Sequence, residues 1–222
     1  MALSLLVLQL ADSAFPTGGF AHSGGLEAAA QLGEIHGPSS LERFLLHNLE
    51  QAGAGVLPIV TAAHATPERL SDLDRRHDAF LTNHVANRAS RAQGRAWLAA
   101  AAHSFGNTSL RELRARARED ESFCGHFAPV FGAISARLGL ERGEAQRLFL
   151  FLHLRGLVSS AVRLSLVGPL EAQALQHRLA GSVLTVLSRH EKRGEDDLTT
   201  TAPLVDLFQG HQDRLYSRLF SS

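Results

Sequence analysis

The stretch FPTGGFAHSGGLE, Phe15–Glu27, contains the residues whose types and spacing are closest to those of a catalytic site. Ala21-His22-Ser23-Gly24-Gly25 has the spacing of the Gly-x-Ser-x-Gly turn, which holds a nucleophilic serine between a strand and a helix. Ser23 would attack an acyl substrate if a histidine and an aspartate from later in the chain completed a triad. A serine hydrolase that uses Ser23 is therefore one candidate function.

Such a triad needs several parallel strands, each followed by a helix, to bring its members together. The apolar run Leu5–Leu10 could form the strand before Ser23. The later segments do not continue this pattern, because alternation of apolar and polar residues at period two is scarce. The serine hydrolase remains an alternative, but the sequence does not predict the strands that would position its triad. The same stretch can instead be a glycine-rich turn between two helices.

Phosphate binding and metal binding have less support. The sequence GGFAHSGG does not match Gly-x-Gly-x-x-Gly, and no Gly-x-x-x-x-Gly-Lys-[Ser/Thr] loop occurs in the chain. The chain has 12 histidines, but no two are four residues apart, and neither HExxH nor CxxC is present. Cys124 and His126 are the nearest approach to a ligand pair, and two residues do not make a metal site. We therefore expect no cofactor, no metal ion and no nucleotide.

The overall composition excludes several other classes. The chain of 222 residues carries 22 basic and 22 acidic side chains, so it has no general attraction to nucleic acid or to an anionic membrane. Its one cysteine allows no internal disulfide and favours a reducing, cytoplasmic setting. The apolar start, MALSLLVLQLAD, has no basic residue and is cut short by Asp12, so we expect a buried first helix rather than a signal peptide or a membrane span.

Apolar residues recur at spacings of three and four along most of the chain, which predicts helices. The predicted helices are Leu41–Ala52, Thr66–Phe80, Ala86–His103, Phe127–Leu138, Ala145–Val167 with a break near Gly156, Glu171–Leu187 and Leu204–Phe220. Two segments, Gly106–Ser122 and Lys192–Thr201, are expected to be loops because they are rich in charged residues. We predict an all-α fold, in which residues 1–222 form a single-domain bundle of roughly eight to ten helices.

Five stretches, in order along the chain, resemble motifs of the urease accessory protein F (UreF) family. They are LQLADSAFPTGGFAHSGGLEAAAQLG, RASRAQGRAWL, HFAPVFGAISARLGL, SSAVRLSLVGPLEAQAL and APLVDLFQGHQDRLYSRLFSS. Together they cover essentially the full chain. The sequence departs from the family pattern at Ala21, where a small hydroxyl residue is frequent, at Gln212, where an acidic residue is common, and at Ser221, where the tail often has arginine.

The resemblance implies an all-helical cytoplasmic chaperone for the maturation of nickel urease, which is not itself an enzyme. Members of the family bind the accessory protein UreD, also called UreH, and recruit and regulate the GTPase UreG. The complex, in which the chain is expected to be a homodimer, helps to deliver nickel to apo-urease. This expectation agrees with the lack of a nucleotide loop, a metal cluster and a complete triad in the sequence.

The matched motifs also imply a set of partner-binding residues. These are Gly18, Gly19, Phe20, His22, Ser23, Gly25 and Glu27 in the first motif, then Arg88, Arg95 and Arg163, and finally His211, Tyr216, Arg218 and Phe220. We expect the glycines to turn the backbone sharply and to expose His22 and Ser23. For the arginines, structural ion pairs and partner contacts remain equally open. The C-terminal residues either bind a partner or pack on the core of their own chain.

Overall fold

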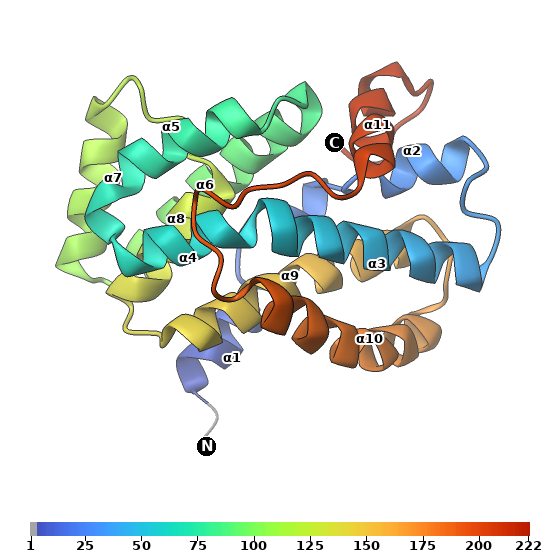
Figure 1. Cartoon of the computed structure of the whole chain (residues 1–222), viewed down its shortest axis with the longest axis horizontal. Helices are drawn as coiled ribbons and strands as arrows, with labels where there is room; N and C mark the ends of the chain where they lie inside the picture. Colours follow the sequence, from blue (N-terminus) through green and yellow to red (C-terminus); the bar gives the residue numbers. More distant parts are fainter. Residues whose placement is uncertain (1–3) are drawn as a thin grey trace.

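The computed structural model describes residues 4–222 (Figure 1). The α-helices are α1 Leu5–Ala11, α2 Leu26–Gln31, α3 Pro38–Gly55, α4 Leu57–Ala65, α5 Leu70–Phe80, α6 His84–Ser104, α7 Thr108–Glu119, α8 Phe127–Arg137, α9 Arg142–Arg163, α10 Pro169–His190 and α11 Pro203–His211. Three short 3-10 helices are Gly19–Ala21, Pro67–Arg69 and Gln212–Arg214. Residues 4–222 contain no strand, so the all-α prediction is confirmed.

The core is built around the aromatic side chains of α6, α8 and α9. Trp97 is fully buried, and its ring centroid lies 5.1 Å from that of Phe131 and 5.7 Å from that of Phe127. Phe149 of α9 completes the group, 5.4 Å from Phe131. Phe15, just before the glycine-rich stretch, joins the same cluster, 5.2 Å from Trp97. The N-terminal loop is therefore anchored in the core at its first residue.

Helix α4 was missed by the sequence analysis, although it packs closely on α8. Six of the nine residues of α4 are buried, so its sequence, LPIVTAAHA, is mostly apolar and shows no clear helical stripe. The close packing depends on Gly132 of α8. A Cβ at this position would lie 2.3 Å from the carbonyl oxygen of Val60, so only glycine lets the two helices approach this closely.

Helix α9 is continuous, so the predicted break near Gly156 is wrong. Glycine costs a helix interior about 1 kcal/mol relative to alanine. The burial of many α9 side chains, Leu150, Leu154 and Leu157 among them, offsets this cost. In Figure 1, α9 and α10 lie together on one side of α3.

The predicted loop Gly106–Ser122 is also wrong, because most of it is helix α7. Gly106 ends the preceding turn with φ of 59°, and the side chain of Asn107 caps α7 by accepting a hydrogen bond from the amide of Ser109 at 2.8 Å. The buried Leu110 attaches α7 to the core. The second predicted loop, Lys192–Thr201, is confirmed as a segment without helix.

The two ends of the chain differ from the prediction. At the C-terminus, α11 and the short turn after it stop at Arg214, and residues 215–222 are irregular rather than helical. At the N-terminus, Met1–Leu3 of the predicted buried helix lie outside the described residues. Within α1, Leu10 is buried, but Leu5 and Leu8 are 81% and 47% exposed, so the prediction of a buried helix is wrong for this face. Across residues 4–222, no helix is long and apolar enough to cross a membrane.

Candidate functional site: a loop and tail held by one carboxylate

The glycine-rich loop, residues 15–27, and the C-terminal tail, residues 212–222, form one structure around the carboxylate of Glu27. Glu27 lies in the first turn of α2 and is 2% exposed. Its Oε1 accepts a hydrogen bond from the amide of Leu219 at 2.6 Å. Its Oε2 accepts from the amide of Phe220 at 3.1 Å and from Nε2 of Gln212 at 2.6 Å. A buried carboxylate is tolerated only when it is hydrogen-bonded, and here three tail donors supply those bonds.

Direct backbone contacts continue this pairing beyond Glu27. The amide of Ser23 donates to the carbonyl oxygen of Ser222 at 2.6 Å, and the amide of Ser221 donates to the carbonyl oxygen of Ala21 at 2.9 Å. The ring Nδ1 of His22 lies 2.6 Å from Oγ of Ser222. Burial, and then the nearby charge of Arg88, lowers the pKa of His22, so its ring is neutral in this contact. The tail therefore covers the loop from Ala21 to Ser23.

Arg163 of α9 holds the two segments together from the side. Its guanidinium carbon lies 3.7 Å from the ring centroid of Phe20 and 4.1 Å from that of Phe220. The same guanidinium donates a hydrogen bond to the carbonyl oxygen of Phe20. A cation between two aromatic faces adds an attraction that neither segment could make alone.

Gly25 lets α11 pack against the loop. Its φ is 86°, a left-handed conformation that side-chain-bearing residues rarely adopt. A Cβ here would lie 3.0 Å from the amide nitrogen of Gln209 and 3.2 Å from the carbonyl oxygen of Val205. Asn48 fixes the preceding residue, since its Nδ2 donates to the carbonyl oxygen of Gly24 at 3.1 Å. The oxygen of the same amide lies 3.1 Å from Nε2 of His153, so the ring of His153 is hydrogen-bonded within the chain.

Comparisons with known proteins identify the family to which the chain belongs. Residues 35–180 match the UreF family model. "Urease accessory protein F" of Arabidopsis thaliana is 41% identical over 217 residues, which cover 96% of this chain and 90% of that protein. The Oryza sativa (subsp. indica) protein of the same name is 40% identical over 215 residues, 96% of this chain and 82% of its own. "Urease accessory protein UreF" of Mycobacterium tuberculosis is 30% identical over 211 residues, 95% of each chain.

The chain belongs to the UreF family. The resemblance read from the five sequence motifs is therefore confirmed. The family model begins at residue 35 and ends at residue 180, so it leaves out both the loop and the tail. The alignments with the named relatives extend over nearly the whole chain.

In this UreF-family chain, the expectation that the loop exposes Ser23 is wrong. The Ser23 side chain is 0% exposed, and its Oγ has no hydrogen-bond partner among the described residues. Its neighbour His22 is engaged with Ser222 instead. The segment before the loop is helix α1 rather than a strand. The geometry of a serine nucleophile and its base is therefore not formed.

Several other residues of the expected partner surface also lie inside the chain. Gly25 is buried against α11, Glu27 is buried beneath the tail, and Phe220 is 3% exposed, packed on Arg163. Their contacts are internal, so they support a surface but do not form it. Gly18 and Gly19 begin the turn, and His211 is half-buried at the end of α11.

In the loop and the tail, the exposed side chains of the set are those of Phe20, Tyr216 and Arg218. Phe20 is 69% exposed and Tyr216 is fully exposed, and Leu219, which the sequence analysis did not select, is 53% exposed. The loop and the tail pair with each other through the bonds described above, and both contribute exposed side chains. We refer to Phe20, Tyr216, Arg218 and Leu219 as the tail surface.

The structure gives Arg88 and Arg95 different roles. Arg88 makes a two-pronged ion pair with Asp213, at 2.8 Å and 3.2 Å. Arg218 and His84 contact the same carboxylate, each at 3.2 Å. The bond from Arg88 is the main cause that lowers the pKa of Asp213. Arg95 is exposed and has no ion pair with any residue of the described chain, so the choice between structural and partner roles stays open for it.

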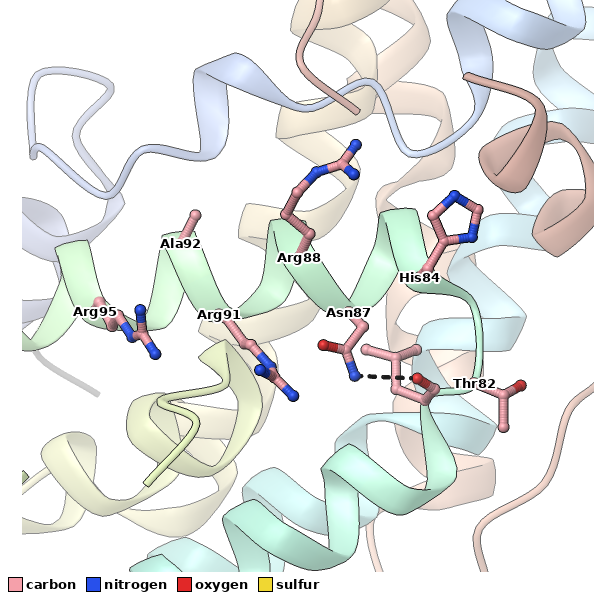
Figure 2. A pocket seen from close by; sticks show the side chains of 8 residues that line it. Thr82, His84, Asn87, Arg88, Arg91, Ala92 and Arg95 are labelled. Carbon is pink, nitrogen blue, oxygen red and sulfur yellow. Dashed lines mark hydrogen bonds between the residues drawn. The ribbon is translucent and has the colours of Figure 1, made fainter. Parts of the chain in front are cut away.

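A cavity of about 520 Å³ lies beside α6, where these arginines are found (Figure 2). Its polar lining comes from Thr82, His84, Asn87, Arg88, Arg91 and Arg95. Figure 2 shows the three arginines leaving α6 one after another along the helix, with Arg91 and Arg95 on the same side. The sequence analysis selected Arg88 and Arg95 but missed Arg91, which shares their spacing of three and four residues.

A second polar cluster joins Asp78, Cys124 and His126, whose possible ligand atoms lie within 4.8 Å of one another. Oδ1 of Asp78 already accepts hydrogen bonds from Asn87 at 2.9 Å and from Arg91, and lies 3.0 Å from Nε2 of His126. The guanidinium of Arg91 already pairs with the carboxylate of Asp78, so the cluster is a hydrogen-bonded network within the chain.

Asp74, one helical turn before Asp78, fixes the backbone of the same segment. Its carboxylate accepts from the amides of Cys124, Gly125 and His126 at 2.7 Å, 2.9 Å and 2.7 Å. The sequence analysis missed both aspartates. Their spacing of four residues on one face of α5 was the signal that could have revealed them.

Proposed function

We propose that this chain is a non-enzymatic assembly factor in urease maturation. In this proposal it binds UreD, recruits and regulates the GTPase UreG as a homodimer in the cytoplasm, and helps to transfer nickel, as cargo, to apo-urease. Membership of the UreF family supports this function, since the similar proteins from plants and Mycobacterium tuberculosis are named urease accessory proteins. The buried and unpartnered hydroxyl of Ser23 argues against the alternative, a serine hydrolase.

The observation that carries the proposal is the tail surface. Tyr216 is fully exposed at the centre of a tail that is otherwise fixed by the buried Glu27, Gln212 and Phe220. Tyrosine and arginine are enriched at the energetic centres of protein interfaces. An exposed tyrosine on an ordered segment can bind a partner without a large loss of conformational entropy. We assign this surface to the contact with UreD.

The experiment is copurification with UreD and UreG from the same host. Replacing Tyr216 with alanine removes a side chain that makes no hydrogen bond within the described chain, so the melting temperature of the isolated protein should stay within about 1–2 °C. Capture of UreD should fall at least tenfold, because an interface centre contributes about 2 kcal/mol or more. Leu170→Ala, at an 89% exposed position on α10, is the matched control.

Undiminished capture of UreD by the Tyr216→Ala protein would remove the tail surface from the proposal. Equal loss with the Leu170→Ala control would show that the effect is not local. If the unaltered chain captures neither UreD nor UreG and does not raise urease activity in cells, the proposed function itself is wrong.

A further inference from the structure

The arginines of α6 line a groove beside the tail surface, to which Arg88 is joined because it shares Asp213 with Arg218. Arg88, Arg91 and Arg95 are three and four residues apart and extend over about 10 Å of the helix axis. Figure 2 shows the guanidinium groups of Arg91 and Arg95 on one side of α6 and that of Arg88 on the other side. Together with Thr82 and Asn87, these side chains line the cavity of about 520 Å³. The groove is therefore lined by planar hydrogen-bond donors, two of which, Arg91 and Arg95, point to the same side.

The positive charge of this groove is only partly neutralised. Arg88 shares Asp213 with Arg218 and His84. Arg91 shares Asp78 with the amide of Asn87 and the ring of His126.

Arg95 has no carboxylate within 4 Å among the described residues. Burial raises the pKa of the nearby thiol of Cys124, so this group is uncharged at neutral pH and supplies no anion. The groove thus has three guanidinium groups and two carboxylates that other donors share.

Arg95 is held in position although its charge is unpaired. Gly125, with φ of 77°, lies directly under its side chain. A Cβ on Gly125 would be 2.9 Å from Cγ and 3.4 Å from Nε of Arg95. Gly94 lets this segment approach α6, because a Cβ there would be 2.2 Å from the carbonyl oxygen of Gly125. The apolar stem of Arg95 therefore packs on backbone while its head stays in solvent, which reduces the entropy lost on binding an anion.

We propose that this groove binds an acidic segment of a partner protein, with carboxylates spaced about one helical turn apart. The inference rests on the proposed function, since it assigns a second contact in the same assembly. Arginine pairs with carboxylates through two parallel hydrogen bonds, and Arg91 and Arg95, four residues apart and on the same side of α6, match glutamates or aspartates at i and i+4 of a partner helix.

The shape of the groove favours this occupant over other anions. A single phosphate is compact and cannot contact guanidinium groups that are spread over about 10 Å along a helix. A single-stranded nucleic acid needs a longer basic track and aromatic side chains on which bases stack. The lining contains no aromatic side chain other than the ring of His84, and the net charge of the chain is zero.

The test uses fluorescence anisotropy with the full chain at low salt. The probe is a fluorescein-labelled, alanine-rich helical peptide with a pair of glutamates at i and i+4, and the matched probe has glutamine at both positions. Only the glutamate peptide should bind. Arg95→Ala should weaken this binding about fivefold and Arg95→Glu at least tenfold, because a removed or reversed charge acts on an exposed pair. Arg147→Ala, at an exposed arginine of α9 with no ion pair in the described chain, should bind like the unaltered protein.

Other outcomes would overturn the inference. They are equal binding of the glutamine peptide, no binding of either peptide, no effect of Arg95→Glu, and displacement of the peptide by millimolar tripolyphosphate or by a single-stranded oligonucleotide that binds more tightly.

The same Arg95→Glu protein should also recover less UreG or UreD when it is copurified. If complexes of the unaltered chain form but are indifferent to Arg95→Glu, the groove assignment is wrong while the proposed function stands. If no complex forms, the proposed function fails, and the peptide titration still decides the groove.

Discussion

Glu27→Gln tests whether one buried carboxylate organises the tail. The substituted amide keeps one acceptor oxygen but turns an NH2 group toward the other tail donors. One hydrogen bond, for example that from the amide of Leu219 at 2.6 Å, can remain. The amide of Phe220 then faces a donor and loses its partner. Gln212 can flip to present its own oxygen, which at present has no hydrogen-bond partner among the described residues.

The expected cost of this change is about 3 kcal/mol for closure of the tail. A hydrogen bond to a charged group contributes about 1.5–3 kcal/mol, so the loss of two such bonds costs about 3 kcal/mol at the lower value. The neutral bond gained by the flip of Gln212 is offset by the loss of its bond to the carbonyl oxygen of Phe220. Because the tail can open without unfolding the helices, its opening equilibrium should rise by about a hundredfold.

Hydrogen exchange of a peptide covering residues 215–222 measures this opening directly, and trypsin cleavage after Arg218 gives an independent readout. Glu34→Gln is the matched control, because Glu34 is an exposed acid just after the same helix and accepts no side-chain hydrogen bond in the described chain. Exchange that changes by less than threefold in the Glu27→Gln protein would refute the reasoning. Equal acceleration in the Glu34→Gln control would refute it as well.

Two further predictions concern stability. Burial lowers the pKa of His153 from 6.5 to about 4, so the unfolded chain binds the extra proton first as the pH falls, and stability decreases below pH 6.5. In urea unfolding, this group should lower the free energy of unfolding by about 2 kcal/mol between pH 7 and pH 5. His153→Gln should remove this pH-dependent loss, and His36→Gln, at an exposed histidine, should not. Gly25→Val should lower the melting temperature by about 6–10 °C, because the φ of Gly25 is 86° and a Cβ there would meet the backbone of α11. Ser23→Ala should change the melting temperature by less than about 3 °C, because the hydroxyl makes no hydrogen bond in the described chain. A pH profile that His153→Gln leaves unchanged, or a larger effect from Ser23→Ala than from Gly25→Val, would contradict these expectations.

The sequence predicted the helices whose burial is one-sided. Leu41–Ala52, Thr66–Phe80 and Ala86–His103 each present an apolar stripe, and each corresponds to a helix of the structure with ends that differ by a few residues. Phe127–Leu138 was also predicted correctly, although residues 128–135 are all buried. The failures have a different cause. Helix α4 is largely buried and has no polar face that would mark a stripe. Helix α7 has an apolar stripe, the buried Leu110 with the partly buried Leu113 and Ala117, but its many charged residues favoured the prediction of a loop.

The candidate site was only partly accessible to sequence reasoning. The density of glycine predicted a sharp turn at residues 18–25, and the left-handed backbone of Gly18, Gly24 and Gly25 confirms it. The role of Glu27 could not be predicted, because its three donors are supplied by residues 185 to 193 positions away. The same holds for Arg88, whose partner Asp213 lies 125 positions further along the chain.

The departure at Gln212 from the family pattern follows from the same carboxylate. Gln212 is fully buried, and its Nε2 lies 2.6 Å from Oε2 of Glu27. An acidic residue in this conformation would place two carboxylates against each other out of water, and its carboxylate would have no hydrogen to donate to Glu27. The amide instead donates to Glu27 and to the carbonyl oxygen of Phe220 at 3.2 Å. In this chain, glutamine at position 212 lets α11, the loop and the tail close around a single negative charge, and the exposed tyrosine of the tail depends on that closure.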